Sequence, residues 1–343
     1  MRILVIGPSW VGDMVMSHSL YRAIKQLHPD AQLDVMAPDW CRPMLTRMPE
    51  VDNTIRMPLG HGELNLPVRW RLGRELAGTY DWAITQPNSL KSALIPLFAG
   101  IKKRTGWKGE SRYGLLNDLR SNKTDFPLMV DRYRALAWPK SQVSQASDLP
   151  ALLRPQLQFD EENRNQALLN NKLNQDRPIL ALCPGAEFGP AKRWPEEHYA
   201  VVAEALINKG WQVWLFGSAK DKPVAAEIIK RLPQSLQQHG HNLAGNTSLG
   251  EAIDLMSLAA AVVSNDSGLM HIAAALGRPL AAVYGSSSPL YTPPLCDKVA
   301  ILHTDTPCRP CFKRTCPLNH LECLTKLMPE QIISSIDALT TSN

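Results

Sequence analysis

The stretch SNDSGLMHIAAALG, residues 264–277, decides the fold of this chain. It follows a short apolar run that ends in Val262 and Val263, as a buried strand does. After it, apolar residues recur with the spacing of one helix face: Leu269, Ile272, Ala273 and Leu276. A strand, a small polar turn and a helix form the repeating unit of a parallel α/β sheet. The stretch therefore predicts an α/β fold.

The turn in this stretch is typical of an anion site. Asp266, Ser267 and Gly268 belong to residue types that cap helices or let backbone amides approach a ligand closely. The unpaired amides and the dipole at the start of the following helix favour a phosphate. His271 follows Ser267 by four residues and so lies on the same side of the helix. It either contacts a phosphate oxygen or packs beneath the turn. The turn predicts the diphosphate end of a nucleotide site.

The rest of the chain repeats the alternation of strands and helices. Strands are predicted at residues 2–7, 32–37, 54–57, 82–85, 179–183, 211–216 and 280–284. Helices are predicted at residues 89–99, 128–138 and 329–339, among others. The pattern indicates two Rossmann-like domains facing a cleft. The expected organisation is an N-terminal domain at 1–155, a linker region at 156–177, a nucleotide-binding domain at 178–328 and a C-terminal helix at 329–343.

Size and composition fit a folded, water-exposed protein. The 343 residues suffice for two domains, and 44% hydrophobic with 20% charged residues is typical of globular chains. No apolar run reaches the roughly 18–20 residues of a membrane-spanning helix. The start MRILVIG lacks the features of a secretory signal and leads directly into a strand. We therefore expect a cytoplasmic protein.

Two local clusters admit more than one interpretation. Residues 100–120 hold six basic side chains interleaved with Trp107 and Tyr113, and form either a solvated loop or a surface for an anionic partner. The basic residues are Lys102, Lys103, Arg104, Lys108, Arg112 and Arg120. Near the end of the chain, Cys308, Cys311, Cys316 and Cys323, with His320 between them, form either a structural metal site or a group of reduced thiols. The metal site would have five candidate ligands for four positions, and a catalytic metal is not expected.

Three further loops follow predicted strands. Asp13 comes after the first strand and serves either as a helix N-cap or as a functional carboxylate. The loop 183–195 contains Gly185 and Lys192, which suit close backbone approach and neutralisation of a diphosphate. Gly217 and Ser218 end another strand, where they could meet a ribose or base.

These loops together predict group transfer from a nucleotide-diphosphate donor. No Asp-x-Asp occurs in the chain, so no acidic clamp for a divalent metal is evident. Lys192 and a helix N-terminus would then stabilise the leaving group. Asp13 would accept the proton of an acceptor hydroxyl as general base.

The chain resembles the ADP-heptose:lipopolysaccharide heptosyltransferases, most closely those of type II. Matching motifs follow one another in order along nearly the whole chain. They lie at residues 6–13, 58–62, 87–94, 104–109, 183–195, 215–221 and 265–271. So many long motifs in one order are far more specific than a single glycine-rich loop.

The resemblance implies a glycosyltransferase of the B type, which inverts the sugar without a metal or other cofactor. Its N-terminal domain would bind the acceptor, and its C-terminal domain would bind ADP-L-glycero-D-manno-heptose. It implies that Asp13 is the base, that Lys192 contacts the diphosphate, and that the residues from Asp266 to Gly268 together with His271 form the donor-phosphate loop. Gly185, Gly217 and Ser218 complete the expected donor site. Expected acceptor contacts are Ser9, Asn88, Lys91, Arg104, Trp107 and Arg112.

The implied acceptor is the first heptose of the lipopolysaccharide inner core, attached to Kdo and lipid A at the cytoplasmic membrane face. A peripheral position on the inner membrane follows, and the basic stretch then has phosphates or headgroups as its partner. The loops from His61 to Arg112 favour this acceptor over those of related enzymes. The alternatives are a heptosyltransferase for another core acceptor and a nucleotide-sugar epimerase of the same architecture. A nucleic-acid-binding protein is disfavoured because no binding motif is present. The sequence sets no oligomeric state.

Overall fold

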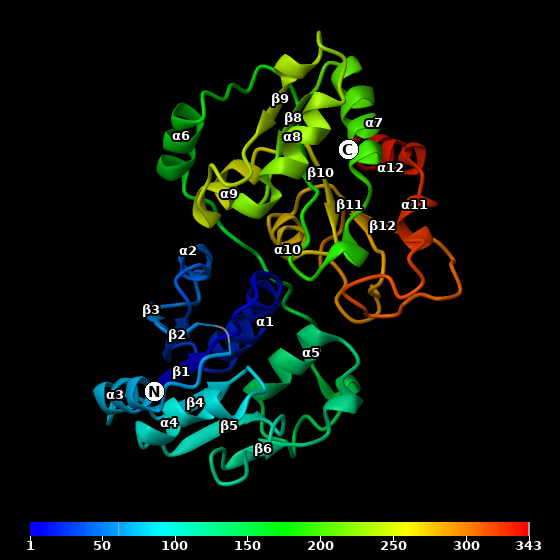
Figure 1. Ribbon diagram of the computed structural model, residues 1–343. Coiled ribbons are helices and arrows are strands. Elements are labelled where there is room, and N and C mark those ends of the chain that lie inside the picture. Colours follow the sequence, from blue (N-terminus) through cyan, green and yellow to red (C-terminus); the bar gives the residue numbers. More distant parts are fainter. Residues whose placement is uncertain (61, 342–343) are drawn as a thin grey trace. The chain divides into compact units, whose positions relative to one another are not determined.

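A computed structural model describes residues 1–60 and 62–341 of the chain. It divides into two compact units, Met1–Pro155 and Gln156–Asn343 (Figure 1). In the described residues, the strands of each unit form a six-stranded, fully parallel sheet. The α/β fold with two Rossmann-like units is confirmed.

The N-terminal unit has the strand order β3-β2-β1-β4-β5-β6. Its strands are β1 (Arg2–Ile6), β2 (Gln32–Ala37), β3 (Asn53–Arg56), β4 (Trp82–Thr85), β5 (Lys103–Trp107) and β6 (Asp118–Arg120). Its α-helices are α1 (Val11–Leu27), α2 (Arg42–Leu45), α3 (Leu66–Glu75), α4 (Leu94–Phe98) and α5 (Met129–Arg134).

The centre of this sheet is apolar because it is covered on both faces. The side chains of β4 and all but the first of β1 are buried, as a doubly covered parallel sheet requires. Helix α1 packs against α5, while α3 packs against α4. The chain leaves β1 toward β2 and leaves β4 toward β5, in opposite directions across the sheet. The loops after β1 and β4 therefore flank a topological switch point, where open α/β sheets bind ligands.

The C-terminal unit has the strand order β12-β11-β10-β7-β8-β9. Its strands are β7 (Ile179–Cys183), β8 (Gln212–Leu215), β9 (Gly240–Asn242), β10 (Ala261–Asn265), β11 (Leu280–Val283) and β12 (Val299–Leu302). Its α-helices are α6 (Glu161–Asn170), α7 (Glu196–Asn208), α8 (Lys222–Lys230), α9 (Leu249–Met256), α10 (Gly268–Ala275), α11 (Glu322–Thr325) and α12 (Pro329–Thr341).

The switch point of this unit lies between β7 and β10. These strands are paired neighbours, with Ser264 opposite Cys183 in the register. The chain runs from β7 to β8 on one side and from β10 to β11 on the other. Helices α7, α8 and α12 pack in one group, and α6, α9 and α10 in another. The loops after β7 and β10 are thereby placed side by side at the carboxyl edge of the sheet.

The predicted strands agree with β1 to β4, β7, β8, β10 and β11, whereas β5, β6, β9 and β12 were missed. Strands β5, β6 and β9 lack apolar runs and lie at or next to a sheet edge, whereas the edge strand β12 is short but apolar. The predicted loop at 100–120 therefore contains two strands. The predicted helix at 89–99 is a 3-10 turn, η1 (Leu90–Ala93), followed by α4. The helix at 128–138 is shorter, since α5 passes into the 3-10 turn η3 (Ala135–Ala137).

The segments outside the two expected domain cores both belong to the C-terminal unit. Residues 156–177, expected as a linker, contain α6, which packs against α9. The C-terminal helix α12 packs against α7, and Ile332 and Ile336 join the hydrophobic core of this unit. In the part of the chain that the structure describes, no helix has both the length and the apolar character needed to cross a bilayer.

Candidate functional site

Asn265 joins the two loops at the switch point of the C-terminal unit. It is the last residue of β10 and is fully buried. Its Oδ1 accepts a hydrogen bond from the backbone N–H of Trp194 (3.1 Å), and its Nδ2 donates to the carbonyl of Pro184 (2.7 Å). Both partners belong to the loop after β7. The sequence did not predict this role of Asn265, because a contact over 71 positions leaves no local pattern.

Lys192 and Asp266, one from each of these loops, form an ion pair. Lys192 ends the 3-10 turn η5 (Pro190–Lys192), and its Nζ lies 2.5 Å from Oδ2 of Asp266. Asp266 is buried, whereas the Lys192 side chain keeps 17% of its surface exposed. The carboxylate is thus covered and the ammonium group reaches solvent. The buried carboxylate of Asp266 therefore holds the ammonium group of Lys192 beside the turn that was predicted to bind the donor phosphates.

Helix α10 begins at the expected turn. Its N-cap is Ser267, whose side chain makes no capping hydrogen bond and lies 3.3 Å from the hydroxyl of Ser264. The first amides of a helix have no partner within it, so this end offers donors to an anion. His271 is buried one turn in. Burial lowers its pKa to about 4, with Lys192 also lowering and Asp266 raising it. The imidazole is therefore neutral at pH 7.

Gly185, Gly217 and Ser218 surround the carboxylate of Asp221. A Cβ added at Gly185 or Gly217 would lie 2.6 or 2.7 Å from Asp221 side-chain atoms. The backbone N–H and hydroxyl of Ser218 both donate to Oδ2 of Asp221, at 2.9 and 2.8 Å. This packing accounts for both glycines without a ligand. Asp221 was not among the predicted site residues.

In the N-terminal unit, Asp13 lies in the first turn of α1. The N-cap is Trp10, so the interpretation of Asp13 as the N-cap residue is wrong. An acidic side chain at this position is favoured by the helix dipole. Burial, and secondarily the charge of Asp13, raise the pKa of the Cys41 thiol to about 12. Nearby, the indole N–H of Trp40 donates to the carbonyl of Ser9 (2.8 Å), which fixes the strand-end loop that precedes α1.

A cation that the sequence did not single out contacts the loop after β4. Lys123 lies in the 3-10 turn η2 (Lys123–Asp125), and its Nζ donates to Oδ1 of Asn88 at 2.8 Å. Burial, with repulsion from Arg132 and Arg112, lowers the pKa of Lys123 to about 8. Lys91 follows in the same loop as Asn88, and its carbonyl accepts a bond from Arg69. Asn88 and Lys123 together form a partly covered polar group at this switch point.

Three predicted acceptor residues have internal partners instead. Arg112 is fully buried and donates to the carbonyls of Pro87, Lys108 and Trp107. Trp107 is only 2% exposed, and its indole N–H donates to the carbonyl of Arg132. The guanidinium of Arg104 donates to the carbonyls of Leu115, Ile101 and Gly114. The side chains of all three therefore support the surrounding backbone.

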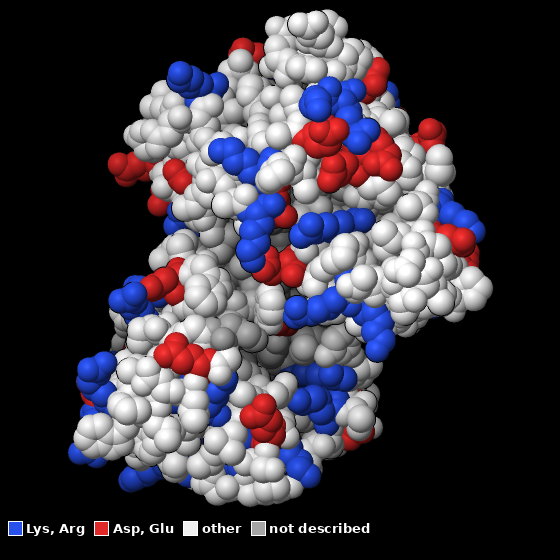
Figure 2. Space-filling model, in the orientation of Figure 1, with Lys and Arg blue, Asp and Glu red and all other residues white. Residues whose placement is uncertain are grey.

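The basic stretch therefore exposes fewer cationic side chains than its composition suggested. Arg120 is also buried, and Lys103 lies over the ring of Trp82 at 3.7 Å. Figure 2 shows a face on which Lys and Arg side chains are interspersed with Asp and Glu. His61, where the predicted acceptor-specific loops begin, lies outside the described residues.

Comparison with known proteins defines the class. The model of glycosyltransferase family 9 (heptosyltransferase) matches residues 69–322, and the chain belongs to this family. It is a glycosyltransferase with the B-type fold. The crystal structure of a family 9 protein from Veillonella parvula shares this fold, with a TM-score of 0.84 over 100% of this chain and 98% of that one, at 18% identity.

Within the family, the chain is most like type II enzymes. It is 58% identical to lipooligosaccharide heptosyltransferase 2 of Haemophilus influenzae over 88% of each chain. It is 52% identical to lipopolysaccharide heptosyltransferase 2 of Escherichia coli, over 99% of this chain and 98% of that one. The structure of E. coli ADP-heptose LPS heptosyltransferase II aligns with a TM-score of 0.90 and 50% identity, covering 99% of this chain and 98% of that one.

Proposed function

We propose that this chain transfers L-glycero-D-manno-heptose from ADP-L-glycero-D-manno-heptose to the first heptose of heptosyl-Kdo2-lipid A, in the lipopolysaccharide inner core. The transfer inverts the anomeric carbon and uses no metal ion at the diphosphate. The observation that carries the proposal is the Lys192–Asp266 pair at the switch point, beside the N-terminus of α10. The similarity to type II heptosyltransferases supports the choice of donor and acceptor.

The donor site works by electrostatics. The ammonium group of Lys192 and the first amides of α10 bind the diphosphate, and their charge stabilises the ADP that leaves. Asp266 holds Lys192 in place from the buried side. His271 stays neutral and binds a phosphate oxygen through an N–H rather than as a cation. Gly217 and Ser218, held in place by Asp221, border the nucleoside.

Asp13 supplies the base. Its carboxylate takes the proton of the acceptor hydroxyl while the hydroxyl oxygen attacks the anomeric carbon. The bond from that carbon to the phosphate oxygen breaks, and its electron pair leaves with ADP. Attack opposite to the leaving group inverts the configuration.

The acceptor is bound by Ser9, Asn88 and Lys91, together with Lys123. An ammonium group with little competing negative charge suits an anionic acceptor such as a Kdo or phosphate-bearing lipid. An acceptor anchored in the inner membrane would require the enzyme to work peripherally at its cytoplasmic face.

The deciding experiment measures ADP release with acceptors that carry zero, one or two heptoses. We expect release only with the one-heptose acceptor. A preference for zero or two heptoses would assign the chain to another core acceptor. Product analysis covers the remaining alternative, because an epimerase would isomerise the sugar without any acceptor.

The metal-free scheme has its own test. Adding Mg²⁺ or Mn²⁺ to protein assayed in EDTA should leave the rate unchanged, since Lys192 and α10 already neutralise the diphosphate. A rate that depends on the added cation would contradict this scheme.

A further inference from the structure

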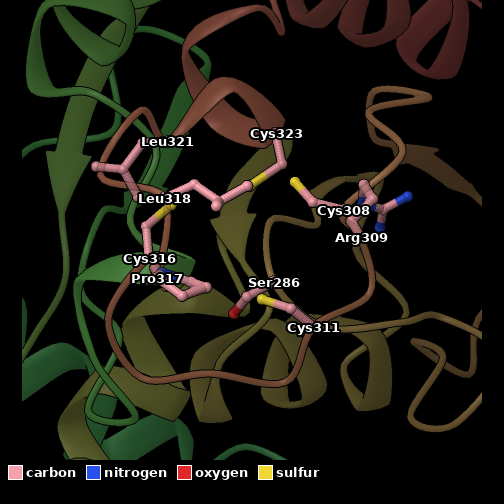
Figure 3. A pocket seen from close by; sticks show the side chains of 10 residues that line it. Ser286, Cys308, Arg309, Cys311, Cys316, Pro317, Leu318, Leu321 and Cys323 are labelled. Carbon is pink, nitrogen blue, oxygen red and sulfur yellow. The ribbon is translucent and has the colours of Figure 1, made fainter.

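Four cysteines of the C-terminal unit line one small cavity (Figure 3). They are Cys308, Cys311, Cys316 and Cys323, of which the first three lie in the irregular segment between β12 and α11. The cavity has a volume of about 20 Å³, which is room for one sphere the size of a water molecule. A single metal ion would fit such a space.

The sulfur atoms approach the cavity from different sides. Figure 3 shows the side chains of Cys308 and Cys323 pointing toward each other, and Cys311 beside Ser286. Cys316 lines the same cavity as these three cysteines. All seven cysteines of the chain are free thiols.

Two polar features of the cavity favour a bound ligand. Ser286 is 1% exposed and lines the cavity, yet its hydroxyl has no hydrogen-bond partner among the described residues. Backbone N–H groups of residues 318–321 are directed at the sulfur of Cys316. Amides that point at a sulfur favour the thiolate, which is the form that binds metals.

The structure also reduces the five candidate ligands to four. His320 is absent from the cavity lining, and its Nδ1 accepts a hydrogen bond from the backbone N–H of Glu322 at 2.9 Å. Four sulfur ligands match the tetrahedral coordination that zinc and mononuclear iron adopt in proteins.

We propose that Cys308, Cys311, Cys316 and Cys323 bind one thiolate-preferring divalent ion, Zn²⁺ or Fe²⁺, as a structural site. Among the described residues, no three His, Cys, Asp or Glu side chains are already arranged around a common point as metal ligands. Binding therefore draws the sulfurs inward across the cavity. The segment that carries three of the cysteines can move with their sulfur atoms, because residues 303–321 form no helix or strand.

The site would brace the loop that carries Lys192. Two backbone hydrogen bonds start from residues between Cys311 and Cys316. The N–H of Phe312 donates to the carbonyl of Ser286 (2.8 Å), and the carbonyl of Arg314 accepts from the N–H of Ala191 (3.1 Å). Ala191 directly precedes Lys192 in η5. This consequence rests on the proposed donor site, whereas the metal site does not.

The test begins with the metal content of the untagged full-length chain, isolated under reducing conditions. Elemental analysis should find about one zinc or iron per chain and tell the two ions apart. Metal-depleted protein should take up one Zn²⁺ in competition with a chromophoric chelator and gain thermal stability. Substitution with Co²⁺ should give thiolate-to-metal absorption bands.

The variants Cys311→Ser and Cys316→Ser should reduce metal occupancy at least about tenfold. Cys296→Ser is the matched control, because its sulfur belongs to the same unit but not to the cavity lining. The two cavity variants should also raise KM for the donor sugar nucleotide, while Cys296→Ser leaves it unchanged.

The proposal is overturned if reduced protein takes up no Zn²⁺ or Fe²⁺ in the titration. A Cys308–Cys323 disulfide in freshly isolated protein would overturn it as well. Stoichiometric metal binding in a chain that does not use ADP-heptose would leave this site standing and remove the proposed function instead.

Discussion

The ammonium group of Lys192 lies 2.5 Å from the carboxylate of Asp266, although 74 positions separate them in the sequence. Strands β7 and β10 are paired neighbours, and this pairing brings their following loops together. The buried carboxylate thereby holds a cation at the edge of the sheet, with its outer side open to a ligand.

Lys192 and Asp266 should act as one unit. We expect Lys192→Gln to lower kcat/KM for ADP-heptose by about 10²–10³-fold, as for other contacts that stabilise developing charge. Asp266→Asn should lower it less, because the lysine remains but loses its anchor. The double variant should be no worse than Lys192→Gln, which a double-mutant cycle in the ADP-release assay measures. Fully additive effects would show that Asp266 acts independently of the lysine. Lys220→Gln, at an exposed ion pair with Glu187, is the control.

Asp13→Asn should separate catalysis from donor binding. Loss of a general base lowers kcat by about 10²–10⁴-fold. The affinity for ADP, measured by calorimetry, should stay unchanged because the donor loops belong to the other unit. Asp30→Asn, in an exposed turn, is the matched control. Wild-type kcat in Asp13→Asn would remove this residue from the base role.

The neutral state of His271 sets its pH behaviour. With a pKa of about 4, the imidazole gains its proton only in acid, so its titration should leave no trace in the rate between pH 6 and 8. NMR of the ligand-free protein should show a His271 resonance that does not move above pH 5.5. A midpoint near 6.5 would mean that the side chain is exposed and charged under assay conditions.

Lys123 predicts an alkaline limit on acceptor binding. Its pKa of about 8 means that the ammonium form, which attracts an anionic acceptor, is lost as the pH rises through 8. Between pH 7 and pH 9, KM for the acceptor should rise by up to about tenfold if only the charged form binds. Lys123→Arg keeps its charge at pH 9 and should show a flat profile. A similar rise in that variant would assign the limit to the acceptor's own ionisation.

Asn265 predicts a loss of stability. Asn265→Ala leaves the N–H of Trp194 and the carbonyl of Pro184 without this partner. Each buried polar group left unpaired costs about 1–3 kcal/mol. The free energy of unfolding, measured in urea, should fall by that order, whereas Asn246→Ala at an exposed site should change little. Equal effects of the two variants would show that Asn265 does not join the loops.

The sequence predicted the central strands well because they are buried on both faces. β2, β4 and β7 were predicted with the bounds the structure has, since their apolar runs need no knowledge of partners. The edge strands β6 and β9 carry polar residues and depend on one neighbour each, so no local pattern predicted them. The edge strand β12 was missed although its four residues are apolar. The N-terminus of α10 could likewise be predicted from the local sequence, because the capping residues and the start of the helical periodicity lie within one turn.

For the predicted acceptor residues, in contrast, the local sequence was a poor guide. Arg104, Trp107 and Arg112 were chosen for charge and aromatic character, which describe a side chain but not where it lies. Folding places Trp107 and Arg112 inside the unit and gives all three guanidinium or indole groups backbone carbonyls as partners. Lys123 was overlooked for the same reason, since its altered pKa comes from its surroundings.

By itself, the sequence determined that this chain is built of alternating strands and helices, that it has two Rossmann-like units, and which loops follow the central strands. These properties depend on periodicity and capping, which are local. Only the tertiary structure decided that Asp266 serves Lys192, that Asn265 ties the loops together and that four cysteines share one cavity. Such relationships depend on which strands are neighbours in the sheet, and contacts between residues far apart in the chain leave no mark in either segment alone.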